Sequence, residues 1–132
     1  MLGKLSRLSD AGPLFLRITV GFAGIYHGHG MLFGGMRDFT AAVAALGLPG
    51  ILAWAAALSE FVGGILLVLG LLTRWSALFF AITMSVAVVK VHWHEGYPKL
   101  EYPLLLGVAA VSLVFTGGGW LSFDRLVIRK ES

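Results

Sequence analysis

Long apolar stretches separated by short polar or glycine-rich breaks dominate the sequence. Each of the four longest approaches the roughly 20 residues that a helix needs to cross the hydrocarbon core of a membrane, and Pro13 suits the first turn of a helix. The pattern predicts an all-α fold: an integral membrane four-helix bundle forming a single transmembrane domain over residues 1–132. The expected helices cover about residues 13–33, 51–72, 75–92 and 101–116.

The segment 36–49 has a different pattern. Its apolar residues recur at helical spacing, opposite a polar face; they are Met36, Phe39, Val43 and Leu46. This amphipathic pattern predicts a short interfacial helix between the first two spans, which either lies at the membrane surface or folds back into the bundle. Gly47 and Pro49 are expected to end it.

The composition agrees with a membrane protein and excludes several kinds of chemistry. Only 13% of the 132 residues are charged, against about a quarter in soluble domains. The absence of cysteine excludes disulfides, thiolate metal sites and iron–sulfur clusters on this chain. The net charge of +3 does not predict nucleic-acid binding, because the basic residues lie at segment ends and form no patch. Eighteen glycines favour close helix packing in lipid and permit a homo-oligomer.

The distribution of lysine and arginine predicts the orientation in the membrane, because short cytoplasmic loops carry an excess of these residues. If both termini are cytoplasmic, the outside holds Arg37, Lys90 and Lys99. The first span is expected to stay as an anchor, because it is long for a signal peptide and no clear cleavage site follows. The orientation with both termini inside is favoured because it places six basic residues there: Lys4, Arg7, Arg74, Arg125, Arg129 and Lys130.

Two charged residues lie deepest in the apolar sequence, Arg17 and Glu60. An ionised side chain at the bilayer centre costs at least about 2.5–3.5 kcal/mol on insertion scales, so each is expected to face the bundle interior. Because the first two spans run antiparallel, an Arg17–Glu60 ion pair is one expected arrangement. The pair either only fixes the helix register or is catalytic, with Glu60 carrying a proton and Arg17 as its electrostatic partner.

Three further side chains are expected in the outer half of the bundle near Glu60. His27 and His92 lie on small-residue faces of their stretches, and Glu101 opens the last stretch. We predict that they bind a ligand, for example by hydrogen bonding the oxygens of a quinone. His27, His92 and Glu60 are the alternative metal ligands, and the two histidines could hold a haem iron, but no H-E-x-x-H spacing supports a metal. His29 and His94 are expected to point away.

Several motifs together resemble the DoxX family of small bacterial membrane proteins. The resemblance covers about residues 14–125, and the order and spacing of the motifs carry it. The matching motifs are Leu16-Arg17 with Gly21, His27-Gly28, Leu32 to Gly35, Glu60 with Gly63-Gly64, Leu69 to Arg74, Glu101 to Leu105, and Thr116 to Gly119 continuing through Ser122 to Asp124.

The resemblance implies a four-helix protein of the bacterial cytoplasmic membrane. Relatives are described as membrane subunits of thiosulfate:quinone oxidoreductase or as partners in oxidative-stress complexes. The leading hypothesis is therefore a redox-associated, quinone-interacting subunit that works with a soluble or membrane redox partner. The alternatives are a non-enzymatic scaffold or maturation partner and a small-molecule permease. One departure from the family is Met31, where relatives often have a lysine that could bind an anion.

Overall fold

The computed structural model describes residues 8–9, 11–119 and 122–124 of the chain. Over these residues it contains helices and no strand, which confirms the all-α prediction. In chain order the elements are α2 (Ala11–Gly30), the π-helical η1 (Met31–Gly35), α3 (Met36–Ala45), α4 (Ile51–Leu69), α5 (Thr73–Val86), the π-helical η2 (Ala87–His92) and α6 (Tyr97–Thr116).

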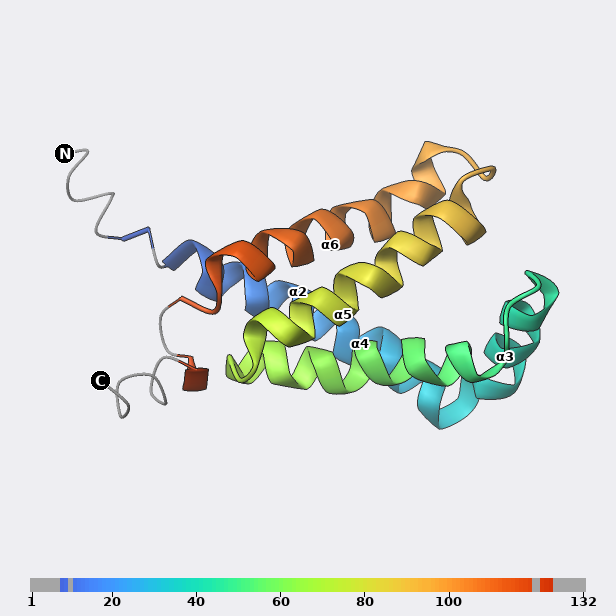
Figure 1. Cartoon of the computed structure of the whole chain (residues 1–132), viewed down its shortest axis with the longest axis horizontal. Helices are drawn as coiled ribbons and strands as arrows, with labels where there is room; N and C mark the ends of the chain where they lie inside the picture. Colours follow the sequence, from blue (N-terminus) through green and yellow to red (C-terminus); the bar gives the residue numbers. More distant parts are fainter. Residues whose placement is uncertain (1–7, 10, 120–121, 125–132) are drawn as a thin grey trace.

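The helix bounds lie close to those expected, with one clear difference. The last helix begins at Tyr97 rather than near residue 101, because Pro98 occupies its first turn, where the missing N–H and the fixed φ of proline cost nothing. The short helix expected between the first two spans is α3, which packs against α4 at one end of the bundle (Figure 1).

Three helical segments are long and apolar enough to cross a membrane: Ile51–Leu69, Thr73–His92 and Tyr97–Thr116. The remaining long helix, α2, also has 20 residues, but Arg17, His27 and His29 make it more polar. It packs along α4 and also contacts α6 (Figure 1). The chain is therefore an all-α membrane bundle in which α2, with its charged and histidine side chains, packs against apolar helices.

The orientation of this bundle in the membrane stays a prediction. Of the six basic residues expected inside, only Arg74 lies in the part of the chain that the structure describes. The other five lie outside the described residues: Lys4, Arg7, Arg125, Arg129 and Lys130.

Glycines form the contact between α2 and α4, as their number suggested. A Cβ atom added to Gly24 would lie 2.5 Å from the backbone oxygen of Glu60 and 2.7 Å from the ring of Phe80. A Cβ on Gly21 would meet the backbone oxygen of Gly64 at 2.7 Å. The two backbones therefore touch, which is the close approach that small residues allow between membrane helices.

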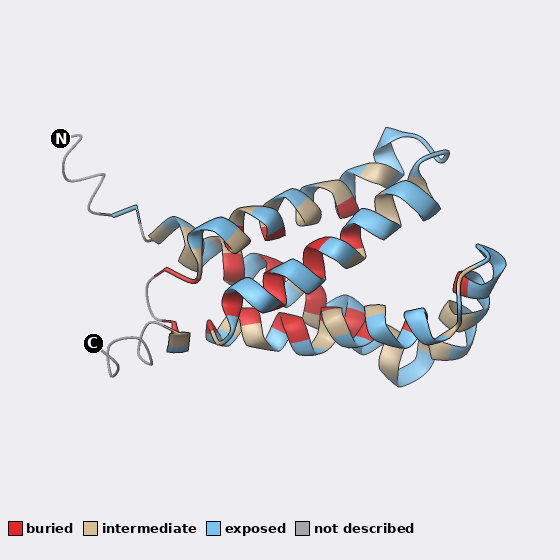
Figure 2. Cartoon of the chain, viewed as in Figure 1, coloured by how far each residue is buried: buried red, intermediate tan, exposed pale blue. Residues whose placement is uncertain are grey.

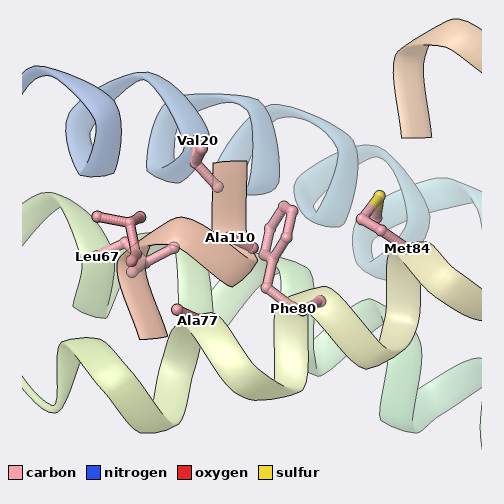
Figure 3. Close-up of a cluster of buried hydrophobic side chains, with 8 residues drawn as sticks. Val20, Leu67, Ala77, Phe80, Met84 and Ala110 are labelled. Carbon is pink, nitrogen blue, oxygen red and sulfur yellow. The ribbon is translucent and has the colours of Figure 1, made fainter. Parts of the chain in front are cut away.

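The hydrophobic core lies toward the end of the bundle at which α4 turns into α5 (Figures 2 and 3). Toward the opposite end, α5 and α6 diverge from α4, and the ribbon there is mostly exposed or half-buried (Figure 2). Tight packing thus holds one end of the bundle, and the other is left open. The core cluster consists of Val20, Leu67, Ala77, Phe80, Ala81, Met84, Ala110 and Leu113.

The segment after α6 folds back over the turn between α4 and α5. The carboxylate of Asp124 accepts hydrogen bonds from the backbone N–H groups of Leu72 at 2.6 Å and Thr73 at 2.8 Å. The N–H of Asp124 donates to the backbone oxygen of Gly70 at 2.9 Å. Because Leu72 offers no capping side chain, Asp124 satisfies N–H groups at the start of α5 from a distant part of the sequence.

Candidate functional site

A cavity of about 410 Å³ lies in the half of the bundle where the helices diverge. Its size falls in the range of about 300–1,000 Å³ that is typical of small-molecule sites. All the helices and both π-helical segments contribute to its walls, which are mainly apolar. The polar side chains among its lining residues are His27, Ser59, Glu60, Thr83, His92 and Tyr102.

Glu60 is the buried acidic residue of this cavity, with only 8% of its surface exposed. Its backbone oxygen faces Gly24 across the α2–α4 contact, so the glycine packing fixes where the side chain starts. Among the residues that the structure describes, no side chain forms an ion pair with its carboxyl group. Glu60 is therefore a carboxyl group at membrane depth that faces a cavity, as expected from the sequence.

Arg17 does not form the expected ion pair with Glu60. Its guanidinium donates to backbone oxygens instead: Nε to Gly118 at 2.9 Å, and Nη1 to Leu67 at 3.1 Å and Val68 at 2.6 Å. Leu67 lies about 10 Å further along α4 than Glu60. The prediction of a pair is wrong because the C-terminal end of α4 carries a partial negative charge and backbone oxygens with a lone pair to spare, and these attract the guanidinium.

Arg17 is buried away from the cavity. The side chain is 1% exposed and is not among the cavity-lining residues. Its hydrogen bonds join α2 to the end of α4 and to the segment after α6. The catalytic role predicted for Arg17 therefore has no contact with the cavity to support it, and the geometry favours a structural role.

His27 and Tyr102 meet at the cavity from two different helices. Their ring centroids are 4.8 Å apart, with the rings tilted by 54°. Tyr102 lines the same cavity as Glu60. His27 was predicted from the sequence, but Tyr102 was not. The feature of the sequence that could have indicated Tyr102 is its position next to Glu101, near the start of the last helix and at the same end of the bundle as His27.

Glu101 itself does not line the cavity. It is exposed on α6, whereas the next two residues, Tyr102 and Pro103, contribute to the wall. One residue corresponds to a rotation of about 100° around a helix, which is enough to turn the carboxylate away. The structure thus brings together His27, Glu60 and His92 from the predicted set, and places Tyr102 where Glu101 was expected.

His92 lines the outer part of the cavity at the end of η2. Its Nδ1 lies 2.7 Å from Oε2 of Glu95, so the ring nitrogen donates to the carboxylate. This hydrogen bond is the main cause that lowers the pKa of Glu95 below its usual range. His92 therefore links the cavity wall to an exposed carboxylate just beyond the helix.

The lowered pKa of Glu95 gives a pH prediction. Because the pKa of Glu95 is lower in the folded state, the His92–Glu95 hydrogen bond adds to folding stability at pH values above the usual pKa of a glutamate. This stabilisation is lost as the pH falls through the lowered pKa. Replacing His92 with alanine should raise the pKa of Glu95 toward its usual range, as measured by NMR titration of the labelled carboxyl carbon. His94→Ala should leave the titration unchanged. Equal curves for all three proteins would contradict the hydrogen bond.

His29 and His94 lie away from the cavity, as expected. His29 contacts Phe33, with ring centroids 4.8 Å apart, and borders an open depression of about 700 Å³ on the outer side of α2 and η1. The walls of that depression come from one continuous helical stretch, and no buried charged group lines it. The cavity beside Glu60 is therefore the stronger candidate site.

The sequence offered His27, His92 and Glu60 as metal ligands. In the described part of the chain, no group of three histidine or acidic side chains is arranged to hold a metal ion. His27, Glu60 and His92 come from three different elements of the cavity wall. Together they place hydrogen-bonding groups at several points around the cavity wall.

Comparisons with known proteins agree with the architecture. The DoxX family profile matches residues 12–93, a range that includes His27, Glu60 and His92. "Putative oxidoreductase CatD" of Bacillus subtilis (strain 168) is 29% identical over 126 residues, covering 95% of this chain and 93% of that protein. "Inner membrane protein YqjF" of Escherichia coli (strain K12) is 31% identical over 132 residues, covering 96% of this chain and 99% of that protein. No solved structure matches the chain. With more than half of its length matched, this membrane protein belongs to the DoxX family.

Proposed function

We propose that this protein is a quinone-interacting subunit of a membrane oxidoreductase, and that the cavity beside Glu60 binds the quinone ring. The observation that carries the proposal is the position of Glu60, a buried carboxyl group without an ion-pair partner among the described residues, facing a mainly apolar cavity. Acidic groups at membrane depth are costly, so they mark functional sites by default.

The side chains around Glu60 fit a quinone ring. A quinone supplies two carbonyl oxygens on a flat ring, and it takes up two electrons and two protons when it is reduced. His27 and Tyr102 could donate hydrogen bonds to one edge of such a ring, and their own ring contact holds them in place. The apolar walls exclude water from the ring faces.

In this proposal the residues have separate roles. Glu60 donates or accepts a proton at the cavity, as a general acid or base within hydrogen-bond reach of the ligand. His27 and Tyr102 orient the ring. His92, bonded to the exposed Glu95 at 2.7 Å, connects the cavity wall to the surface.

The wider setting also belongs to the proposal. The name of the Bacillus subtilis relative describes that protein as an oxidoreductase, and the name of the Escherichia coli relative places that protein in an inner membrane. By analogy, we assign this chain to a bacterial cytoplasmic membrane, with both termini inside. Because the chain has no cysteine, we assign the electron supply to a soluble or membrane partner protein.

Binding of a tailless benzoquinone tests the ring site. Purified protein in detergent should bind the dimethoxy-methyl-benzoquinone ring saturably in equilibrium dialysis. Glu60→Leu and His27→Ala should each weaken binding about tenfold, because one lost hydrogen bond is worth about 1–1.5 kcal/mol. The lack of cysteine removes thiol adducts with the probe as a source of false binding.

The matched control for this experiment is His29→Ala, on the same helix but outside the cavity. It should bind the ring like the wild type. Equal weakening by His27→Ala and His29→Ala would contradict the ring site. An absence of saturable binding to the wild type would favour the scaffold alternative.

A further inference from the structure

We infer that the cavity opens sideways into the bilayer between α4 and α5, and that this opening holds the apolar chain of a ring-headed lipid. The inference rests on the proposed ring site for the head of that ligand. It adds the class of molecule, an amphiphile with a long hydrocarbon tail, and the route by which it enters.

The wall between α4 and α5 is both part of the cavity and exposed. Four large apolar side chains of this wall line the cavity while keeping about half of their surface exposed. They are Leu52 with 44% exposed, Phe79 with 55%, Ile82 with 52% and Val86 with 43%. A side chain that faces both a cavity and the surroundings marks an opening. In a membrane protein at this depth, the surroundings are lipid chains.

The arrangement of the helices explains why the opening lies there. The helices α4 and α5 meet at the turn beside the core and separate toward η2 (Figure 1). On the other sides, the glycine contact closes α2 against α4, and α5 packs along α6. The rings of His27 and Tyr102 bridge α2 and α6 at the level of the cavity. The α2–α6 side of the cavity thus carries the two polar rings, which are also exposed, and the α4–α5 side carries the large apolar side chains that line the opening.

Small residues on α4 leave room in the opening. Ala55, Ala56 and Ser59 line the cavity along this helix, opposite larger side chains of α5. Thr83 of α5 donates its hydroxyl to the backbone oxygen of Phe79 at 2.9 Å, so its polar group is satisfied within its own helix. The opening therefore presents mainly hydrocarbon, together with the hydroxyl group of Ser59.

A hydrocarbon tail is the occupant that fits these features. From Leu52 to Ser59 the opening extends about 10 Å along α4, which is long enough for a chain of several methylene groups. A small polar substrate would gain nothing from an apolar opening toward lipid. A ligand with a polar ring and an apolar tail would use both ends, with the ring beside Glu60 and the tail between α4 and α5.

A pair of ligands that differ only in the tail tests the inference. The probes are the tailless dimethoxy-methyl-benzoquinone and decylubiquinone, the same ring with a decyl chain, bound to protein in phosphatidylcholine nanodiscs. Ala55→Phe places a large side chain in the opening. It should weaken decylubiquinone binding by about fivefold or more relative to the wild type, because a filled site cannot accept the chain, and leave binding of the tailless ring nearly unchanged. Comparing each variant with the wild type for the same ligand cancels the partitioning of the tail into lipid.

Val62→Phe is the matched control, since Val62 is exposed on the same helix but does not line the cavity. It should change the binding of neither ligand. If Ala55→Phe weakened the binding of both ligands equally, or of neither, the opening would not hold the tail. Bilayer lipid or a second copy of the chain would then be its occupant. If Glu60→Leu had no effect while the tail-specific effect of Ala55→Phe persisted, the ring site would fail and the opening would stand.

Discussion

Replacing Gly24 with alanine should separate α2 from α4 and strongly destabilise the bundle. The added Cβ would lie 2.5 Å from a backbone oxygen and 2.7 Å from the ring of Phe80. A backbone oxygen cannot rotate away as a side chain can, so the helices must shift apart. Overpacking typically costs about 1–3 kcal/mol, and we expect a loss of about 3 kcal/mol in the free energy of unfolding, measured by tryptophan fluorescence during denaturation with SDS.

Gly30→Ala is the control for this prediction, because a Cβ at that position meets nothing within 4 Å. It should be neutral, or stabilising by up to about 1 kcal/mol, since alanine is the better helix former. Equal losses for Gly24→Ala and Gly30→Ala would show that helix propensity rather than the α2–α4 contact controls stability.

Replacing Arg17 with methionine should lower the free energy of unfolding by as much as Gly24→Ala does, or by more. Among the contacts of Arg17, the change removes hydrogen bonds from a charged donor to the backbone oxygens of Leu67, Val68 and Gly118. Hydrogen bonds to charged groups contribute about 1.5–3 kcal/mol each, so a loss of at least about 3 kcal/mol is expected even if the terms are not fully additive. Arg17→Lys keeps the charge but not the planar guanidinium, so its free energy of unfolding should lie between those of the wild type and Arg17→Met.

Two comparisons sharpen the Arg17 prediction. Arg37→Met removes an exposed arginine of α3 and should change stability little; superimposable unfolding curves for Arg17→Met and Arg37→Met would contradict the network. In addition, Arg17→Met and Glu60→Gln should have additive effects, because Arg17 is bonded to the end of α4, about 10 Å along the helix from Glu60, and the two side chains share no partner among the described residues. Strong coupling between them would restore the ion pair that the structure does not contain.

The helices could be predicted from the sequence because their signals are local. Apolar stretches of spanning length and glycine-rich breaks gave the spans, and the alternating faces of 36–49 gave α3. The inward position of Glu60 could also be predicted, because a charged residue within an apolar stretch must avoid lipid. Ligand binding by His27, Glu60 and His92 stays a prediction. The sequence of α2 is less apolar than those of its neighbours, and only its packing against α4 shows how it is accommodated.

The remaining features depend on long-range contacts that residue types do not reveal. Arg17 donates to backbone oxygens. Every residue has such an oxygen, so the sequence cannot single out these acceptors and instead suggests the acidic side chain of Glu60. Asp124 caps α5 from far along the chain. Tyr102 and Glu101 differ by one position, and the phase of α6 was uncertain because its start was placed near residue 101 rather than at Tyr97.

Photoaffinity labelling tests the central claim, a quinone site in the cavity, most directly. An azido-substituted ubiquinone is irradiated with the protein in membrane vesicles, and the labelled peptides are mapped by mass spectrometry. The account predicts saturable labelling within residues 52–60 of α4 and 79–92 of α5 and η2, which line the cavity, and loss of that label when decylubiquinone is added. Labelling confined to the outer side of α2 around Phe22 and His29, or labelling that decylubiquinone does not displace, would contradict it.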